Sequence, residues 1–172
     1  MKKLDVSEDY IISAQKIKLL LMDCDGVLTD GRLYFSERGE ELKVFHVRDG
    51  QGLSLWHAAG FESGIISGRN AAKIIRARAT ELGIAHIKTS SVDKVKDFED
   101  ILSNSGISPE DVAYVGDDIG DLGLMKKVGF PIAVADAVEN VLTNAKYITS
   151  KNGGMGAVRE VIDLLLHYKQ NF

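Results

Sequence analysis

Several features that other protein classes need are scarce or missing in this chain. It has one cysteine, Cys24, among 172 residues, so no disulfide can form within it, and a lone thiol is typical of a reducing compartment. No run of about 18 apolar residues is present, so we predict no membrane-spanning helix. The charged N-terminus, Met1–Asp5, does not resemble a signal peptide. Lys and Arg number 21 against 25 Asp and Glu, which argues against a nucleic-acid partner because such partners need a basic face.

What is present is the composition of a globular domain, with 45% apolar and 27% charged residues. We expect residues 1–172 to form a single domain. Short apolar runs predict buried strands at 17–22, 61–67, 84–88, 111–116 and 131–135. Helix-like stretches lie at 51–59, 71–82, 92–103 and 122–128, followed by the expected capping glycines Gly60, Gly83, Gly106 and Gly129. This alternation predicts an α/β fold, a doubly wound parallel sheet with right-handed crossovers.

One segment interrupts the alternation directly after the first strand. Residues 31–47 read as a β-hairpin, with aromatic and branched residues on both sides of a turn at 36–39. No cap-sized insertion accompanies it. Because a lone two-stranded hairpin is marginal in water, we expect it to pack on another surface, such as that of a second subunit. Further helices are expected within residues 1–16 and in the glycine-rich tail and helix at 151–172.

Two acidic clusters each follow a predicted strand. Asp23 and Asp25 come after the first strand, and Asp117, Asp118 and Asp121 come after the strand at 111–116. Ligand sites in such sheets lie outside the carboxyl ends of the strands, so the clusters are expected to converge. Converging carboxylates repel one another unless a cation lies between them, and oxygen-only ligands select Mg²⁺.

A purely structural interpretation of the acids stays open, because Asp-Gly pairs are ordinary turn sequences and occur three times here. Two acidic clusters at two strand ends are harder to explain as turns. Two further polar positions lie at strand ends. Ser67 and the amides after it are suited to bind a phosphate oxygen, and Lys94 near the start of a predicted helix adds a cation, although either has an ordinary turn or surface interpretation.

These positions match the motifs of a known family. The strings D-C-D-G-V at 23–27, I-S-G at 66–68, Lys94 and G-D-D-x-x-D at 116–121 resemble the four motifs of the haloacid dehalogenase-like phosphohydrolases. Longer strings resemble one branch, the phosphatases of the sugar-acid phosphate 3-deoxy-D-manno-octulosonate 8-phosphate. They are D-C-D-G-V-L-T-D-G at 23–31, H-V-R-D-G-Q-G at 46–52, S-G-R at 67–69, R-A-T-E-L-G-I at 78–84 and G-G-M-G-A-V-R-E at 153–160. The resemblance extends from about residue 17 to about residue 166.

The resemblance implies a role for each matching residue. Asp23 is then the nucleophile that forms an aspartyl-phosphate, and Asp25 is the general acid and then the general base. Mg²⁺ is held by Asp23, the backbone carbonyl of Asp25, and Asp117, with Asp118 and Asp121 supporting them. The phosphoryl group is bound by Ser67, Gly68 and Lys94. The implied substrate-binding residues are Asp25, His46, Val47, Arg48, Asp49, Gly50, Arg69, Arg78 and Lys94.

Within that set, the arginines Arg48, Arg69 and Arg78 are candidates for the substrate carboxylate, since Arg meets carboxylates with two hydrogen bonds. The resemblance also implies a capless, cytoplasmic enzyme of lipopolysaccharide precursor synthesis that assembles as a homotetramer. The chain departs from the family pattern at Gly120 and Gly123, at His46 where Asn is common, and in the apparent length of the segment 68–82. None of these departures removes a catalytic group.

Two alternatives remain open. The substrate is either the eight-carbon sugar acid or a nine-carbon 2-keto sugar acid 9-phosphate, and Arg69 favours the former only modestly. A non-catalytic module that binds a sugar nucleotidyltransferase is the third interpretation. The intact acidic clusters argue against it, because a scaffold does not need carboxylates that repel one another.

Overall fold

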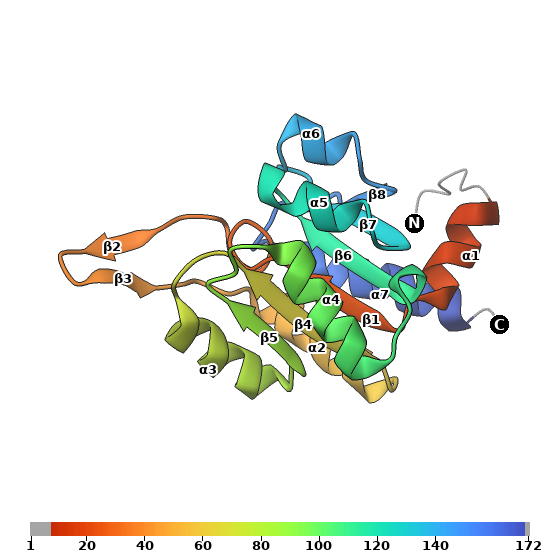
Figure 1. Ribbon diagram of the computed structural model, residues 1–172, viewed down its shortest axis with the longest axis horizontal. Coiled ribbons are helices and arrows are strands. Elements are labelled where there is room, and N and C mark those ends of the chain that lie inside the picture. The colour runs from red at the N-terminus through yellow and green to blue at the C-terminus, as the bar shows by residue number, and fades with distance from the viewer. Residues whose placement is uncertain (1–7, 171–172) are drawn as a thin grey trace.

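Six strands form one parallel sheet in the computed structural model, which describes residues 8–170 (Figure 1). Their order across the sheet is β5-β4-β1-β6-β7-β8. The strands are β1 (Leu19–Met22), β4 (Glu62–Ser67), β5 (His86–Thr89), β6 (Val112–Gly116), β7 (Phe130–Ala133) and β8 (Tyr147–Ile148). The predicted doubly wound parallel sheet is therefore confirmed, and β8 is an edge strand that the sequence patterns did not reveal.

Helices cover both faces of this sheet. Helices α2, α3 and α7 lie on one face, and α4 and α5 lie on the other (Figure 1). The helices are α1 (Glu8–Lys16), α2 (Val47–Ala58), α3 (Ala72–Leu82), α4 (Lys94–Ser105), α5 (Leu122–Met125), α6 (Glu139–Leu142) and α7 (Ala157–Gln170), with single 3₁₀ turns at Pro109–Asp111 and Ile119–Asp121. Part of the helix expected in 1–16, and the last two residues of the expected tail, fall outside the described residues.

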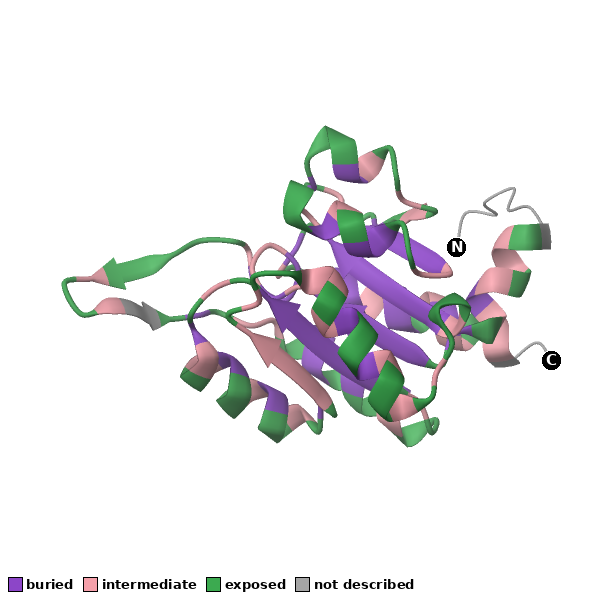
Figure 2. Cartoon of the chain, in the orientation of Figure 1, coloured by how far each residue is buried: buried purple, intermediate pink, exposed green. Residues whose placement is uncertain are grey.

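The centre of the sheet is fully buried, which explains the continuous apolar run that forms β1. All four residues of β1 are inaccessible to solvent, as parallel strands covered on both faces should be. Trp56 of α2 and Tyr114 of β6 are among the largest buried side chains. Figure 2 shows this buried centre beneath helices whose outer faces are exposed. The buried sheet provides the rigid base for the loops at its carboxyl edge.

Two predicted helix boundaries are wrong for physical reasons. The helix expected at 122–128 ends at Met125, and Gly129 is not its cap. A Cβ at Gly129 would overlap the backbone of Glu110, so a close approach of two loops requires glycine there. The helix expected from residue 51 begins at Val47, because His46 caps it and Gly50 and Gly52 are accommodated inside the helix.

The insertion after β1 is a two-stranded hairpin, and the described residues contain no cap domain. Strands β2 (Tyr34–Ser36) and β3 (Gly39–Leu42) pair antiparallel and project beyond the body of the molecule (Figure 1). The exposed apolar side chains of the hairpin segment are Leu33, Tyr34, Phe35, Leu42 and Val44. Among residues 8–170, no helix is both long enough and apolar enough to cross a membrane.

Candidate active site

Three neighbouring strands deliver polar side chains to one edge of the sheet. Asp23 follows β1, Ser67 ends β4, and Asp117 follows β6. The backbone N–H of Asp23 donates to Val115 O at 3.0 Å, which keeps the end of β1 in register with β6. A cavity of about 260 Å³ opens here. It is lined by Asp23, Asp25, Ser67, Gly68, Arg69, Lys94, Asp117, Asp118, Gly120 and Asp121.

The turn after β1 holds the first acidic cluster in place. The carbonyl of Cys24 accepts hydrogen bonds from the backbone N–H groups of Leu28 and Thr29, at 2.9 and 3.0 Å. Cys24 itself is buried. Gly26 has a φ of +89°, and a Cβ there would overlap the carboxylate of Asp117. Glycine at position 26 therefore lets the two acidic clusters meet.

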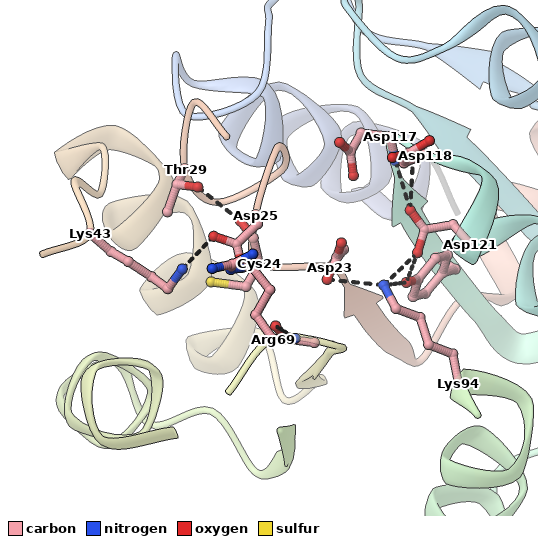
Figure 3. Close-up of polar contacts among 12 residues, drawn as sticks. Asp23, Cys24, Asp25, Thr29, Lys43, Arg69, Lys94, Asp117, Asp118 and Asp121 are labelled. Atoms are coloured by element: carbon pink, nitrogen blue, oxygen red, sulfur yellow. Dashed lines mark hydrogen bonds and ion pairs between the residues drawn. The ribbon is translucent and has the colours of Figure 1, made fainter. Parts of the chain in front are cut away.

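Lys94 is the cation between the clusters (Figure 3). It is the first residue of α4, and the cap residue Asp93 accepts from two backbone N–H groups of that helix, as preferred at helix starts. The Lys94 ammonium lies 3.0 Å from Asp23 Oδ1 and 2.7 Å from Asp121 Oδ1. Its position is therefore set by the start of the helix and by two carboxylates.

Asp121 holds the second acidic cluster in place through hydrogen bonds. It is 1% exposed, and its Oδ1 accepts a 2.6 Å hydrogen bond from the Tyr114 hydroxyl. Its Oδ2 accepts from the backbone N–H groups of Asp117 and Asp118 at 2.9 and 3.2 Å. These bonds, together with Lys94, occupy Asp121, whereas Asp118 is exposed and caps the short turn after it.

Burial and mutual repulsion raise the pKa values of Asp23 and Asp117. The pKa of Asp23 is raised to about 6, chiefly by burial, while Lys94 opposes the rise and Asp121 adds to it. The pKa of Asp117 is raised to about 8, first by burial and then by Asp23 and Asp121. Carboxylates arranged in this way are stabilised by a nearby cation.

The donor set fits a hard divalent cation. Carboxylate oxygens of Asp23, Asp117 and Asp121 all lie within 4.8 Å of one another. Asp117 Oδ1 is buried without a hydrogen-bond partner, which is costly unless a ligand or ion satisfies it. Oxygen-only sites of this kind suit Mg²⁺.

Ser67, Gly68 and Arg69 form the opposite wall of the cavity. Ser67 is 1% exposed, and its hydroxyl accepts from the backbone N–H of Arg69 at 3.4 Å. Gly68 is exposed. This wall presents a hydroxyl, an amide-rich turn and a guanidinium to the same space as Lys94 and the acids, a combination suited to an anionic substrate.

Sequence reasoning missed Lys43, which forms an ion pair with Asp25 Oδ1 (Figure 3). The Lys43 side chain is fully buried. Side chains along an extended chain point alternately to opposite sides. Leu42 and Val44 are exposed, so this alternation indicates that Lys43 between them points inward. Tyr114 was also missed, because it lies within the apolar run that predicts a buried strand, where no polar role is expected.

The other predicted substrate-binding residues lie outside this cavity. His46 caps α2 through its Nδ1, which accepts from the Arg48 backbone N–H at 3.2 Å. Val47 and Arg48 are exposed in the first turn of the helix. Arg48 lines a separate cavity of about 670 Å³ beside Arg159.

The structure places Asp49, Gly50 and Arg78 outside this cavity, among structural contacts, and their role in substrate binding stays a prediction. Asp49 is 1% exposed, and its carboxylate accepts from the Arg159 backbone N–H at 2.7 Å. Gly50 is buried beneath Arg78, whose Nη2 would lie 2.6 Å from a Cβ at position 50. The Arg78 guanidinium lies over the Phe45 ring and pairs with Glu81. These contacts pack α2 against α3 and α7.

The glycine-rich tail lies directly on the turn after β1. Gly154 N–H donates to Val27 O at 2.9 Å, and Gly153 N–H donates to Asp136 Oδ1 at 2.9 Å. A Cβ at Gly153 would overlap Gly26 O. The tail therefore supports the loop that carries Asp23 and Asp25.

Comparison with known proteins agrees with this geometry. Residues 62–162 match the family model described as haloacid dehalogenase-like hydrolase. The chain is 48% identical over 161 residues to the 3-deoxy-D-manno-octulosonate 8-phosphate phosphatase of Escherichia coli strain K12, covering 94% of this chain and 85% of the relative.

Solved structures are similar along the same length. The crystal structure of the Yersinia pestis phosphatase of that name has a TM-score of 0.92 at 44% identity, covering 96% of this chain and 89% of that chain. The Moraxella catarrhalis phosphatase in complex with magnesium, phosphate and KDO has a TM-score of 0.90 at 40% identity, covering 97% and 95%. The chain belongs to the haloacid dehalogenase-like hydrolases, and within them to the 3-deoxy-D-manno-octulosonate 8-phosphate phosphatase family.

Proposed function

We propose that this chain is a Mg²⁺-dependent phosphatase that hydrolyses 3-deoxy-D-manno-octulosonate 8-phosphate to the free sugar acid and inorganic phosphate. The observation that carries the proposal is the convergence of two acidic clusters, Ser67 and Lys94 on one cavity of about 260 Å³. The names of its relatives support the substrate, and the Moraxella complex supports the metal and both products.

Asp23, Asp117 and the backbone carbonyl of Asp25 would hold the Mg²⁺ ion, while Asp121 is occupied by Lys94 and Tyr114. When bound, Mg²⁺ supplies positive charge that offsets the repulsion between an anionic nucleophile and an anionic phosphoryl group. Lys94 adds a cation 3.0 Å from Asp23. Ser67 and the amides after it donate to the phosphoryl oxygens.

The reaction proceeds in two displacements. The Asp23 carboxylate attacks phosphorus, and the bond from phosphorus to the sugar oxygen breaks while Asp25 donates a proton to that oxygen. Water then attacks the aspartyl-phosphate and gives a proton to Asp25, which releases inorganic phosphate and restores the Asp23 carboxylate. Arg69 lines the cavity wall, which supports it over Arg48 and Arg78 as the arginine that binds the substrate carboxylate.

The proposal includes a single domain over residues 1–172, a cytoplasmic location and a homotetramer. Support for assembly comes from the hairpin, which exposes Leu33, Tyr34 and Phe35, since exposed apolar groups of this kind mark interaction surfaces. Light scattering after size exclusion tests the tetramer, and cell fractionation tests the location. A monomer in solution contradicts the assembly without contradicting the reaction.

The decisive experiment measures phosphate release from the eight-carbon and the nine-carbon sugar-acid phosphates, with Mg²⁺ and with a chelator. We expect the eight-carbon substrate to have the higher kcat/KM and the chelator to abolish turnover. Asp23→Asn should lower kcat by about 1,000-fold or more, and an acid-quenched wild-type sample should contain a phosphorylated peptide that includes Asp23. Equal rates for Asp23→Asn and wild type exclude the covalent mechanism. Preference for the nine-carbon substrate changes the assignment, and absent turnover on both refutes it.

A further inference from the structure

Lys43 stands between the hairpin and the acid-base residue of the proposed reaction. It is the first residue after β3 and lies four positions before α2. Its side chain is 0% exposed, and a buried ammonium is strongly unfavourable unless it is paired. The Lys43 ammonium forms an ion pair with Asp25 Oδ1, in the turn after β1 (Figure 3).

The two oxygens of Asp25 have different surroundings. Oδ1 accepts from Lys43, while Oδ2 is buried without a hydrogen-bond partner. Asp25 also lines the cavity that contains Asp23 and Lys94. One oxygen is therefore fixed by a buried cation, and the other remains for a group that enters the cavity.

We propose that Lys43 is a positioning residue, which orients the Asp25 carboxyl group so that its unpartnered oxygen meets the leaving sugar oxygen. This inference rests on the proposed function, because it assigns Lys43 a task in that reaction. It also gives the base of the hairpin a place in catalysis, since the chain that follows β3 reaches the acid-base residue. Lys94 has a different task at the nucleophile, where it lies 3.0 Å from Asp23.

A positioning role predicts that the effect of Lys43 depends on the leaving group. A sugar alkoxide is a poor leaving group and needs the proton from Asp25, whereas p-nitrophenolate leaves without one. In the Mg²⁺-loaded enzyme, we expect Lys43→Met to lower kcat for 3-deoxy-D-manno-octulosonate 8-phosphate by about 10–100-fold. KM should change by less than about threefold, and kcat for p-nitrophenyl phosphate should change by less than about threefold.

Two comparisons separate positioning from loss of folding. Lys18→Met removes an exposed lysine that pairs with Asp111 and should leave both activities unchanged. Lys43→Met in an Asp25→Asn background should cause no further loss with the sugar phosphate, because Lys43 acts through Asp25. Lys43→Gln provides a second variant of the same position, and thermal unfolding of every variant reports whether the fold is retained.

The outcomes distinguish this inference from the proposed function. Equal losses with both substrates in a folded Lys43 variant overturn the positioning role, as does an unchanged kcat with the sugar phosphate. A further loss of kcat in the Asp25→Asn background, beyond about threefold, also overturns it. Wild-type enzyme without turnover of the sugar phosphate overturns the proposed function, and the role of Lys43 falls with it.

Discussion

The carboxylate of Asp49, in the first turn of α2, accepts a 2.7 Å hydrogen bond from the backbone N–H of Arg159 in the first turn of α7. Backbone N–H groups at the start of a helix lack partners within it, so Asp49 caps a helix from a distant part of the chain. Burial raises the pKa of Asp49. Hydrogen bonds from the backbone amides of Arg159, Gly156 and Val158 oppose that rise but are the smaller influence. This contact anchors the glycine-rich tail that lies on the turn after β1.

Removal of the Asp49 cap should destabilise the protein. Asp49→Ala leaves buried amide groups of α7 without an acceptor, at a cost of about 1–3 kcal/mol. For a chain of this size that corresponds to a fall in Tm of about 2–4 °C for each kcal/mol. Asp49→Asn retains an acceptor oxygen and should lose less. Thermal and urea unfolding measure both variants, and an Asp49→Ala variant as stable as wild type would contradict this role.

The acidic clusters should make metal-free protein less stable as the pH rises. Because the folded-state pKa of Asp117 is raised from 3.8 to about 8, the folded state binds more protons than the unfolded state between those values. The free energy of unfolding therefore falls as pH increases through this window. Asp117→Asn cannot ionise, so in chelator it should match or exceed wild type near pH 5 and exceed it by a wider margin near pH 8.

Scanning calorimetry across this pH range, with and without Mg²⁺, measures the effect. Mg²⁺ should raise the Tm of wild type, most strongly at the upper end of the range, and should leave the Tm of Asp117→Asn nearly unchanged. Metal-free wild type that is more stable than Asp117→Asn near pH 8 would show that these carboxylates do not repel one another as their burial indicates.

The Tyr114 hydroxyl should matter for both stability and turnover. Tyr114→Phe removes the 2.6 Å hydrogen bond to Asp121 Oδ1, with an expected loss of about 1–2 kcal/mol. Because Asp121 also holds Lys94 at 2.7 Å, we expect kcat to fall severalfold while KM stays nearly constant. Phosphatase kinetics and urea unfolding on the same preparations measure both effects.

Tyr147→Phe is the matched control, since the Tyr147 hydroxyl donates to Glu160 Oε1 at 2.7 Å, and neither residue lines the acidic cavity. It should lose stability to a similar extent and keep wild-type kcat. A kcat reduced equally in both variants would mean that Tyr114 acts only on the general stability of the fold.

The site residues that can be predicted from the sequence are those at the ends of neighbouring strands. Asp23 and Asp117 follow continuous apolar runs, and Ser67 ends one, so parallel strands bring them together whatever the intervening chain does. Lys94 is predictable for a related reason, because Asp93 caps the helix that it begins. The residue types, together with the rule that ligand sites lie at the carboxyl edge of a parallel sheet, were sufficient to predict that these side chains lie together.

The contacts that sequence reasoning did not predict are contacts between distant segments of the chain. Alternation along the hairpin marks Lys43 as inward-facing, but no local pattern predicts that its ammonium pairs with Asp25 in the turn after β1. Asp49 lies in the first turn of α2, yet its carboxylate caps α7. Gly129 follows a helical pattern but is required by the approach of the Glu110 backbone. Tertiary packing decides all three.

The space at Gly26 links two distant positions of the chain, 26 and 117. The Asp117 carboxylate occupies the volume that any side chain at position 26 would need, so position 26 cannot gain a side chain while that acid stays in place. A descendant that gained a side chain at 26 would have to displace or shorten the acid at 117, and would lose an oxygen donor in doing so. A relative of this chain without glycine at position 26 is therefore marked, by that one residue, as a candidate pseudoenzyme.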